Sequence, residues 1–242
     1  MADAPVALRD VTYAYGKGEL ARPVLRDVDI SVGPGEIVLL TGPSGSGKTT
    51  LLTLIGALRA MQQGSAVVLG QELMGASERQ RVALRRRIGF IFQQHNLLGA
   101  LTAAENVELG LRVTDASLPP AELRQRAAAM LEAVGLGAHR QSRPDQLSGG
   151  QRQRVAVARA LAGAPGLILA DEPTAALDRQ TGGEVVRLLR DLARGRGVPI
   201  LMVTHDPRIL DIADRIVAME DGRILPSEGA ADAPRPLPPF RR

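Results

Sequence analysis

Runs of valine, isoleucine and leucine recur along the chain, separated by stretches in which apolar residues follow helical spacing. Short apolar runs bounded by turn residues predict strands, and their alternation with helical segments favours an α/β domain with a largely parallel sheet. Asp221-Gly222 predicts a tight turn that closes a hairpin with residues 223–225. We expect strands near residues 6–13, 28–32, 36–41, 66–69, 88–92, 167–171, 199–204 and 215–219.

The helical patterns divide the chain into parts. Helices are expected directly after three residues, Gly47, Ser148 and Leu177. Residues 94–160 contain helical patterns and no clear strand, which predicts a helical subdomain inserted between two parts of an α/β core, residues 1–93 and 161–225. Residues 226–242 are rich in proline and cannot supply a core, so we expect a disordered tail there.

Composition places the chain among globular proteins, because 242 residues with 45% hydrophobic content can bury a full core. The longest uninterrupted apolar runs are about four or five residues, far short of the roughly 18 that span a bilayer. Residues 1–20 lack the pattern of a secretory signal. The absence of cysteine excludes disulfides, thiolate zinc sites and cysteine nucleophiles, and it fits a reducing compartment. We therefore expect a cytoplasmic protein.

Arginine supplies nearly all of the positive charge. The net charge is +4, and of 30 lysines and arginines only Lys17 and Lys48 are lysines. A basic surface can bind nucleic acid, but aromatic residues make up 2% of the chain and form no stacking ladder. We therefore expect no nucleic-acid partner. Lys48 remains a candidate for phosphate chemistry, which suits a compact ammonium group.

A glycine-rich loop lies between the apolar residues 37–40 and an expected helix. Its sequence is Gly42-Pro43-Ser44-Gly45-Ser46-Gly47-Lys48-Thr49. The order of strand, loop and helix matches the P-loop and disfavours a chance glycine-rich turn. Backbone N–H groups would cradle phosphates, Lys48 would reach the β and γ phosphates, and the Thr49 hydroxyl would ligate Mg²⁺. Thr50 extends this nucleotide-binding stretch, and ATP and Mg²⁺ are the expected cofactors.

Two carboxylates come directly after a second apolar run, residues 167–170. Asp171 at the end of a buried strand suits a role in holding Mg²⁺ through water, and Glu172 suits orienting or deprotonating the attacking water. A strand can end in two acids by chance. The presence of a P-loop in the same chain favours the catalytic interpretation.

A third segment distinguishes among P-loop proteins, which include kinases, GTPases, helicases and transport ATPases. It reads Leu147-Ser148-Gly149-Gly150-Gln151-Arg152-Gln153-Arg154. Ser148 would cap a helix whose first turn carries Gly149 and Gly150, so that a phosphate can approach bare N–H groups and the positive end of the helix dipole. Residues 148–151 therefore form a second anion site, and the segment resembles the signature of ABC ATPases.

The resemblance to ABC ATPases covers roughly residues 6–225. It implies a P-loop ATPase domain of the α/β class with a mixed sheet and an inserted helical subdomain. In ABC proteins two protomers sandwich ATP, and each gives its P-loop to one nucleotide and its signature to the other. The resemblance therefore implies that the chain works as a homodimer.

Further residues match ABC elements in the order of the family. Gln93 matches the Q-loop glutamine that senses Mg²⁺ and the γ-phosphate, with an ordinary polar loop residue as the alternative. Asp178 matches the D-loop that couples the two sites. His205 matches the switch histidine that contacts the γ-phosphate, with a structural histidine as the alternative. Tyr15 stands where the family stacks an aromatic ring on adenine, and Tyr13 is the competing candidate.

The branch of the family is indicated by residues 92–98 and 101–107, which are similar to the macrolide-exporter and lipoprotein-release branch. Residues 51–56 and 71–77 resemble DevA-type ATPases of heterocyst glycolipid exporters. The permease in that branch has few membrane spans and often joins a periplasmic adaptor. The lipoprotein-release ATPases usually have Thr-Gly-Asn-Leu-Asp where this chain has Thr174-Ala175-Ala176-Leu177-Asp178.

The resemblance thus implies an ATP-hydrolysing subunit of an exporter, peripheral at the cytoplasmic face of the inner membrane, that drives a separate integral-membrane permease. Two alternatives remain open, a regulatory switch of the FtsE kind that controls a cell-wall hydrolase and an importer ATPase. A soluble ABC protein acting on ribosomes or DNA is disfavoured, because such proteins usually carry two ATPase domains or a long coiled-coil insertion.

Overall fold

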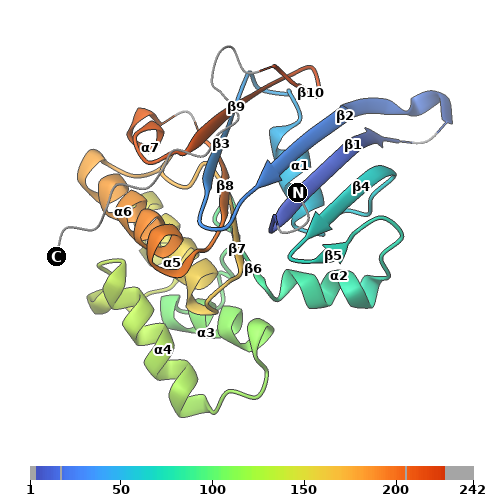
Figure 1. Ribbon diagram of the computed structural model, residues 1–242. Helices are drawn as coiled ribbons and strands as arrows, with labels where there is room; N and C mark the ends of the chain where they lie inside the picture. Colours follow the sequence, from blue (N-terminus) through green and yellow to red (C-terminus); the bar gives the residue numbers. More distant parts are fainter. Residues whose placement is uncertain (1–3, 17, 205, 227–242) are drawn as a thin grey trace.

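A six-stranded sheet organises the computed structural model, which describes residues 4–16, 18–204 and 206–226 (Figure 1). The strand order is β10-β9-β3-β8-β7-β6. Neighbouring strands are parallel except β10, which pairs antiparallel with β9 in the expected hairpin. The strands are β3 (Ile37–Thr41), β6 (Ile88–Ile91), β7 (Leu167–Asp171), β8 (Ile200–Val203), β9 (Arg215–Glu220) and β10 (Arg223–Ile224).

Strands β3, β7 and β8 are buried along almost their whole length, as parallel strands covered on both faces must be. Successive side chains of a strand point to opposite faces, so β3 sends Ile37 and Leu39 into one hydrophobic core and Val38 and Leu40 into another. The sheet therefore separates two cores. This explains why its strands appear in the sequence as continuous apolar runs.

A second, antiparallel sheet has the order β2-β1-β4-β5. Its strands are β1 (Val6–Tyr15), β2 (Arg22–Val32), β4 (Gln63–Val68) and β5 (Gln71–Glu72). The sequence pattern places the start of β2 too late, near residue 28, and does not predict β5. The register of β1 against β2 shifts several times, and Asp10 and Asp27 both lie at φ 50°. These irregularities interrupt the alternation of apolar and polar residues that marks a strand.

Two helices begin at the residue that the sequence predicts, and the helix expected after Leu177 begins one residue later, at Arg179. Figure 1 shows α3 and α4 at the end of the molecule away from the antiparallel sheet. The helices are α1 (Lys48–Ile55), α2 (Glu78–Arg85), α3 (Ala103–Thr114), α4 (Pro120–Ala133), α5 (Gly149–Ala162), α6 (Arg179–Arg196) and α7 (Pro207–Leu210), with 3-10 turns η1 (Gly18–Leu20), η2 (Gly137–His139) and η3 (Pro144–Gln146). No helix within the described ranges is long and apolar enough to cross a membrane.

The two cores have different partners. Residues of α3, α4, α5 and α6 share one core with one face of the six-stranded sheet, and α3 and α4 pack against α5; Leu111, Leu131 and Leu189 are fully or almost fully buried in this core. Helix α1 and the antiparallel sheet cover the other face, where Leu52 and Val11 are fully buried. The phosphate-loop helix and the signature helix therefore lie on opposite faces of one sheet.

A buried amide fixes the segment that precedes α3. The Asn106 side chain is fully buried, its Oδ1 accepts from Leu98 N at 2.8 Å, and its Nδ2 donates to the Leu98, Leu101 and Thr102 carbonyls at 3.2, 3.2 and 2.9 Å. Thr102 also caps α3 through a capping box with Glu105. The Leu98 and Thr102 carbonyls also accept from Leu101 N and Asn106 N, so the Asn106 side chain adds a second bond to each and is the partner of Leu98 N and of the Leu101 carbonyl.

Replacing this amide tests its structural role. Asn106→Ala should lower the free energy of unfolding by about 2–4 kcal/mol, because Leu98 N and the Leu101 carbonyl lose their side-chain partner and a fully buried side chain is shortened. Urea denaturation of this variant, with the exposed Arg112→Ala on the same helix as control, measures the effect. Equal midpoints for the two variants would contradict the assignment.

Candidate nucleotide site

The predicted P-loop connects β3 to α1 through glycines in the left-handed region. Gly42, Gly45 and Gly47 have φ of 134°, 83° and 103°. A Cβ at Gly42 would lie 2.0 Å from the Met219 carbonyl oxygen, so the neighbouring strand also requires glycine there. Gly47 precedes α1 and offers no side-chain acceptor to its first turn. The first-turn N–H groups are therefore available to an anion, as a phosphate-binding helix N-terminus requires.

Lys48 lies over this loop. Its side chain is buried, and Nζ donates to the Gly42 and Pro43 carbonyls at 2.7 Å each and to Ser46 Oγ at 3.3 Å. The loop is also tied to the β9–β10 turn, because Gly222 N donates to Ser46 O at 3.1 Å. Ser44 belongs to the same loop and is exposed. The ammonium group is thus already placed among the atoms that would surround phosphates.

The two ends of the expected Mg²⁺ site meet in the structure. Thr49 Oγ1 donates to Asp171 Oδ2 at 2.9 Å, and Asp171 is buried at the end of β7. A hydroxyl and a carboxylate are oxygen donors of the kind that Mg²⁺ takes, with phosphate oxygens and water completing the shell. Among the described residues, no group of three or more His, Cys, Asp or Glu that could hold a metal ion is found.

Glu172 is the next residue and has an unusual backbone. Its φ is 51°, and its N–H donates to the Val203 carbonyl of β8 at 2.9 Å. A non-glycine residue in this region is uncommon and is held by its surroundings. The turn after β7 therefore sets the direction of the Glu172 side chain relative to Asp171.

The signature residues form a helix cap. Ser148 caps α5, with Gln151 N donating to its Oγ at 3.2 Å and Ser148 N donating to Gln151 Oε1 at 2.8 Å. A Cβ on Gly150 would lie 3.2 Å from the Ala176 carbonyl oxygen, and one on Gly149 would lie 4.0 Å from Ala176 Cβ. The structure thus joins the signature to the predicted D-loop, and no hydrogen bond within the described ranges joins it to residues 42–50.

Asp178 caps α6 in this structure. Its Oδ1 accepts from Thr181 N and Gln180 N, both at 3.0 Å, and these bonds hold the pKa of the carboxyl below its ordinary value. Because the pKa is lowered in the folded protein, the cap contributes its full stability at pH values above the ordinary pKa of an aspartate. This contribution is lost as the pH falls through the lowered pKa of Asp178. This side chain therefore fixes the start of α6, directly after the segment predicted to be the D-loop.

Gln93 lies in an exposed turn after β6, and an arginine that the sequence patterns do not reveal fixes the next part of that turn. Arg159 of α5 donates from Nη2 to the His95 carbonyl at 2.8 Å and from Nη1 to the Asn96 carbonyl at 2.6 Å. His95 and Asn96 both have positive φ, 60° and 48°. Burial lowers the pKa of the Arg159 guanidinium, because removal from water disfavours the charged form. The two carbonyls replace part of the hydration that the charge loses.

Tyr15 is the more accessible of the two candidate base-stacking residues. It is 37% exposed, whereas Tyr13 is 8% exposed, and the two rings form a T-shaped pair with 5.3 Å between centroids. The Tyr15 hydroxyl lies 3.1 Å from Thr50 Oγ1 on α1. The structure therefore brings Tyr15 and Thr50 together at the edge of the P-loop helix.

His205 lies outside the described residues, but its neighbours connect two predicted elements. Thr174, after Glu172, donates through Oγ1 to Asp206 Oδ2 at 2.6 Å. Asp206 N donates to Thr204 Oγ1 at 3.0 Å. The segment after β7 is thus bonded to the segment after β8, where the switch histidine is predicted.

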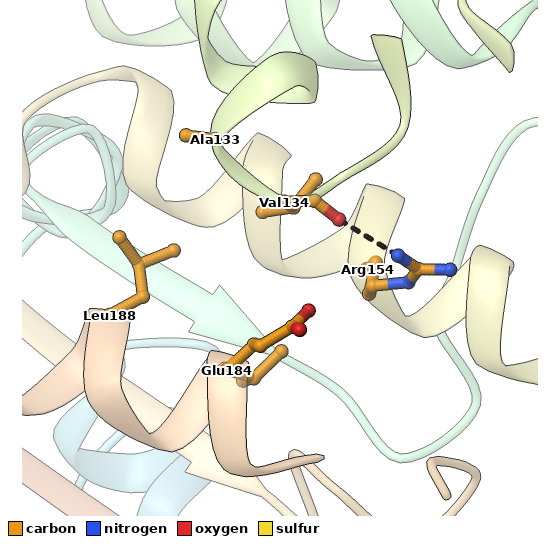
Figure 2. Close-up of a pocket in the computed structure, with 6 residues that line it drawn as sticks. Ala133, Val134, Arg154, Glu184 and Leu188 are labelled. Atoms are coloured by element: carbon orange, nitrogen blue, oxygen red, sulfur yellow. Dashed lines mark hydrogen bonds between the residues drawn. The ribbon is translucent and has the colours of Figure 1, made fainter. Parts of the chain in front are cut away.

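A small cavity elsewhere in the fold carries no such chemistry. Figure 2 shows it between α4, α5 and α6, with Arg154 donating to the Val134 carbonyl at 3.0 Å. Leu188, Val185 and Ala133 supply apolar walls. It shares no residue with the candidate nucleotide site, so we regard it as a packing feature of the helix junction.

The fold and the site define the class of protein: a P-loop connected through Thr49 to a strand that ends in paired carboxylates is the arrangement of a nucleoside triphosphatase. The chain belongs to the ABC transporter family, whose family profile matches residues 25–175. It is an ATP-binding ABC ATPase domain.

Solved structures support this placement. The dimeric post-hydrolysis structure of the ATP-binding cassette MJ0796 bound to ADP and Pi is 40% identical in sequence and superposes with a TM-score of 0.88. The alignment covers 92% of this chain and 97% of that one. The predicted ABC ATPase fold with a mixed sheet is therefore confirmed.

Curated relatives belong to several transport systems. The lipoprotein-releasing system ATP-binding protein LolD of Anaeromyxobacter dehalogenans is 47% identical over 93% of this chain and 94% of its own length. The macrolide export ATP-binding/permease protein MacB of Syntrophobacter fumaroxidans is 46% identical over 93% of this chain, which spans only 32% of that protein. The methionine import ATP-binding protein MetN of Nocardia farcinica is 44% identical over 98% of this chain and 72% of its own length.

The Arg159 contacts give a prediction about the Q-loop. Arg159→Met keeps the aliphatic stem but leaves the His95 and Asn96 carbonyls without their donor, so it should destabilise the protein by about 2–4 kcal/mol. Amide exchange of residues 93–97 should accelerate, measured by mass spectrometry of native protein. The exposed Arg124→Met serves as control. Unchanged exchange in residues 93–97 would contradict the conclusion that Arg159 holds this loop.

Proposed function

We propose that the chain is the ATP-binding and hydrolysing subunit of an ABC exporter that drives a separate membrane permease through ATP-dependent closure of a homodimer. The observation that carries the proposal is the Thr49–Asp171 hydrogen bond beside Glu172, with Lys48 buried over the P-loop. This arrangement gathers a phosphate cradle, oxygen donors for Mg²⁺ and a carboxylate at one edge of the sheet. Its place of action would be the cytoplasmic face of the inner membrane.

The proposed roles are derived from the chemistry of phosphoryl transfer, which needs positioning and charge stabilisation more than covalent help. Residues 42–50 would bind the phosphates, with Lys48 on the β and γ groups and Tyr15 stacking on adenine. Mg²⁺, held by Thr49, Asp171 and the Q-loop Gln93, would neutralise charge on the phosphates. Glu172 would accept the proton of the attacking water, and His205 would contact the γ-phosphate.

The signature residues would act on the nucleotide of a partner subunit. Within the described ranges, no hydrogen bond joins residues 148–151 to the P-loop of their own chain, so a cap with two glycines would remain for a phosphate bound elsewhere. The dimeric MJ0796 cassettes support the same arrangement. Asp178, which orders the start of α6, would lie beside that contact.

The organisation and branch complete the proposal. The core would comprise residues 1–93 and 161–225, with residues 94–160 as the helical subdomain that docks on the permease near Gln93. Residues 227–242 of the predicted tail lie outside the described residues. Similarity to LolD and MacB supports export, with the DevA-type glycolipid exporters as the finer hypothesis and a periplasmic adaptor as a further partner. The similarity to MetN keeps import as an alternative, and the switch of the FtsE kind is the other.

Substitution of the proposed base is a direct test. Glu172→Gln should bind ATP, accumulate dimers and lose at least about 100-fold in turnover, because the amide cannot accept a proton. Size-exclusion chromatography with ATP and a phosphate-release assay measure both effects. Rapid hydrolysis by this variant would refute the assignment of Glu172.

Coupling to a membrane partner tests the proposed function. ATP turnover should rise when the purified chain is combined with the permease encoded beside it in lipid nanodiscs, while Glu172→Gln stays silent under the same conditions. Candidate lipids that stimulate turnover further would support export. Stimulation by a periplasmic solute-binding protein would favour import, and turnover that the permease does not change would contradict the transport proposal.

A further inference from the structure

The connector between α1 and β4, residues 56–62, reaches back to the end of β1, where Tyr15 lies. Gln62 bonds both backbone groups of Ala14: Ala14 N donates to Gln62 Oε1 at 2.8 Å, and Gln62 Nε2 donates to the Ala14 carbonyl at 2.9 Å. Three residues earlier, the Arg59 guanidinium carbon lies 4.8 Å from the centroid of the Tyr15 ring. One connector thus holds the backbone of β1 through Gln62 and the Tyr15 ring through Arg59.

Arg59 is itself anchored. Its Nε donates to Thr53 Oγ1 at 3.1 Å, and Thr53 Oγ1 donates to the Thr50 carbonyl at 2.8 Å. Thr50 in turn lies at hydrogen-bond distance from the Tyr15 hydroxyl. These contacts close a ring of interactions that runs from Tyr15 along α1 to Arg59 and back to Tyr15.

Three contacts therefore constrain Tyr15: Thr50 at its hydroxyl, Tyr13 in a T-shaped ring pair, and the Arg59 guanidinium over its ring. A guanidinium over an aromatic face is attracted by the ring quadrupole. A side chain that is ordered before its ligand arrives loses less conformational entropy on binding. The same helix that begins the phosphate loop thus also orients the ring.

We propose that Arg59 is a positioning residue for the nucleotide base: anchored on Thr53, its guanidinium holds the Tyr15 ring in the orientation on which the base stacks. The inference rests on the proposed role of Tyr15 as the base-stacking residue. It assigns to Arg59 an effect on ligands that carry a base, with no contact to the phosphate groups. Nucleotide affinity would then depend on a residue outside the P-loop and the signature.

Calorimetric titration separates the base from the phosphates. Arg59→Gln should weaken ATP binding to the full chain about three- to tenfold, the range expected for a cation–π contact, and should leave binding of inorganic tripolyphosphate unchanged. The loss should appear in KM rather than kcat. Arg59→Lys keeps the charge and should fall between Arg59→Gln and the parent chain, and the exposed Arg112→Gln on α3 serves as control.

The chain offers a spectroscopic readout of the ring itself. It contains no tryptophan and only two tyrosines, so a Tyr13→Phe protein has Tyr15 as its single tyrosine. In that background Arg59→Gln should raise the quenching of tyrosine fluorescence by acrylamide, because the guanidinium no longer covers the ring. Unchanged quenching would count against the contact.

The outcomes distinguish this inference from the function on which it rests. If Tyr15→Ala leaves ATP affinity unchanged, the proposed base site is wrong. If Tyr15→Ala weakens ATP binding and Arg59→Gln does not, the inference about Arg59 fails alone. Tighter ATP binding by Arg59→Gln would mean that the guanidinium occupies the face needed by the base, which also overturns it. Support requires that Arg59→Gln has no further effect in a Tyr15→Ala protein.

Discussion

The hydrogen bond between Thr49 and Asp171 is the contact on which the candidate site depends. Strands β3 and β7 are not neighbours, because β8 lies between them. The first turn of α1 must therefore cross over β8 to bring the Thr49 hydroxyl to the end of β7, and α1 packs on both β7 and β8. Parallel strands end at the same edge of the sheet, so this crossing places the P-loop and both carboxylates together.

The sheet that makes this contact possible also separates two cores. Alternate residues of β3 enter opposite cores, so α1 on one face and α5 on the other share the same strands as a support. Because protein interiors are closely packed, a movement of α1 or of α5 would displace residues of the sheet that lies between them. Arg159 extends this support from α5 to the loop after β6, where Gln93 lies. The geometry around a nucleotide is therefore linked to the helices of residues 103–162 by side-chain contacts.

Local patterns were sufficient to predict the parts of the site that depend on neighbouring residues. The P-loop, the carboxylates after β7 and the cap at Ser148 each combine a strand or helix boundary with residue types suited to phosphate or Mg²⁺, and all three could be placed from the sequence. Arg59 and Arg159 could not. Arg159 contacts carbonyls 63 and 64 residues away, and an arginine on a helix carries no local sign of such a partner. Long flexible side chains choose their partners through tertiary structure.

The departure from the lipoprotein-release pattern at residues 174–178 lies at a contact within the ATPase domain. Ala176 faces the glycines of the signature, where a Cβ on Gly150 would already be 3.2 Å from the Ala176 carbonyl oxygen. This close approach is to the backbone of Ala176, whose side chain is exposed. The same segment is also joined to the loop after β8, because the Thr174 hydroxyl donates a hydrogen bond to the Asp206 carboxylate. The signature and the segment before α6 therefore meet through backbone atoms, and this contact does not itself require alanine at position 176.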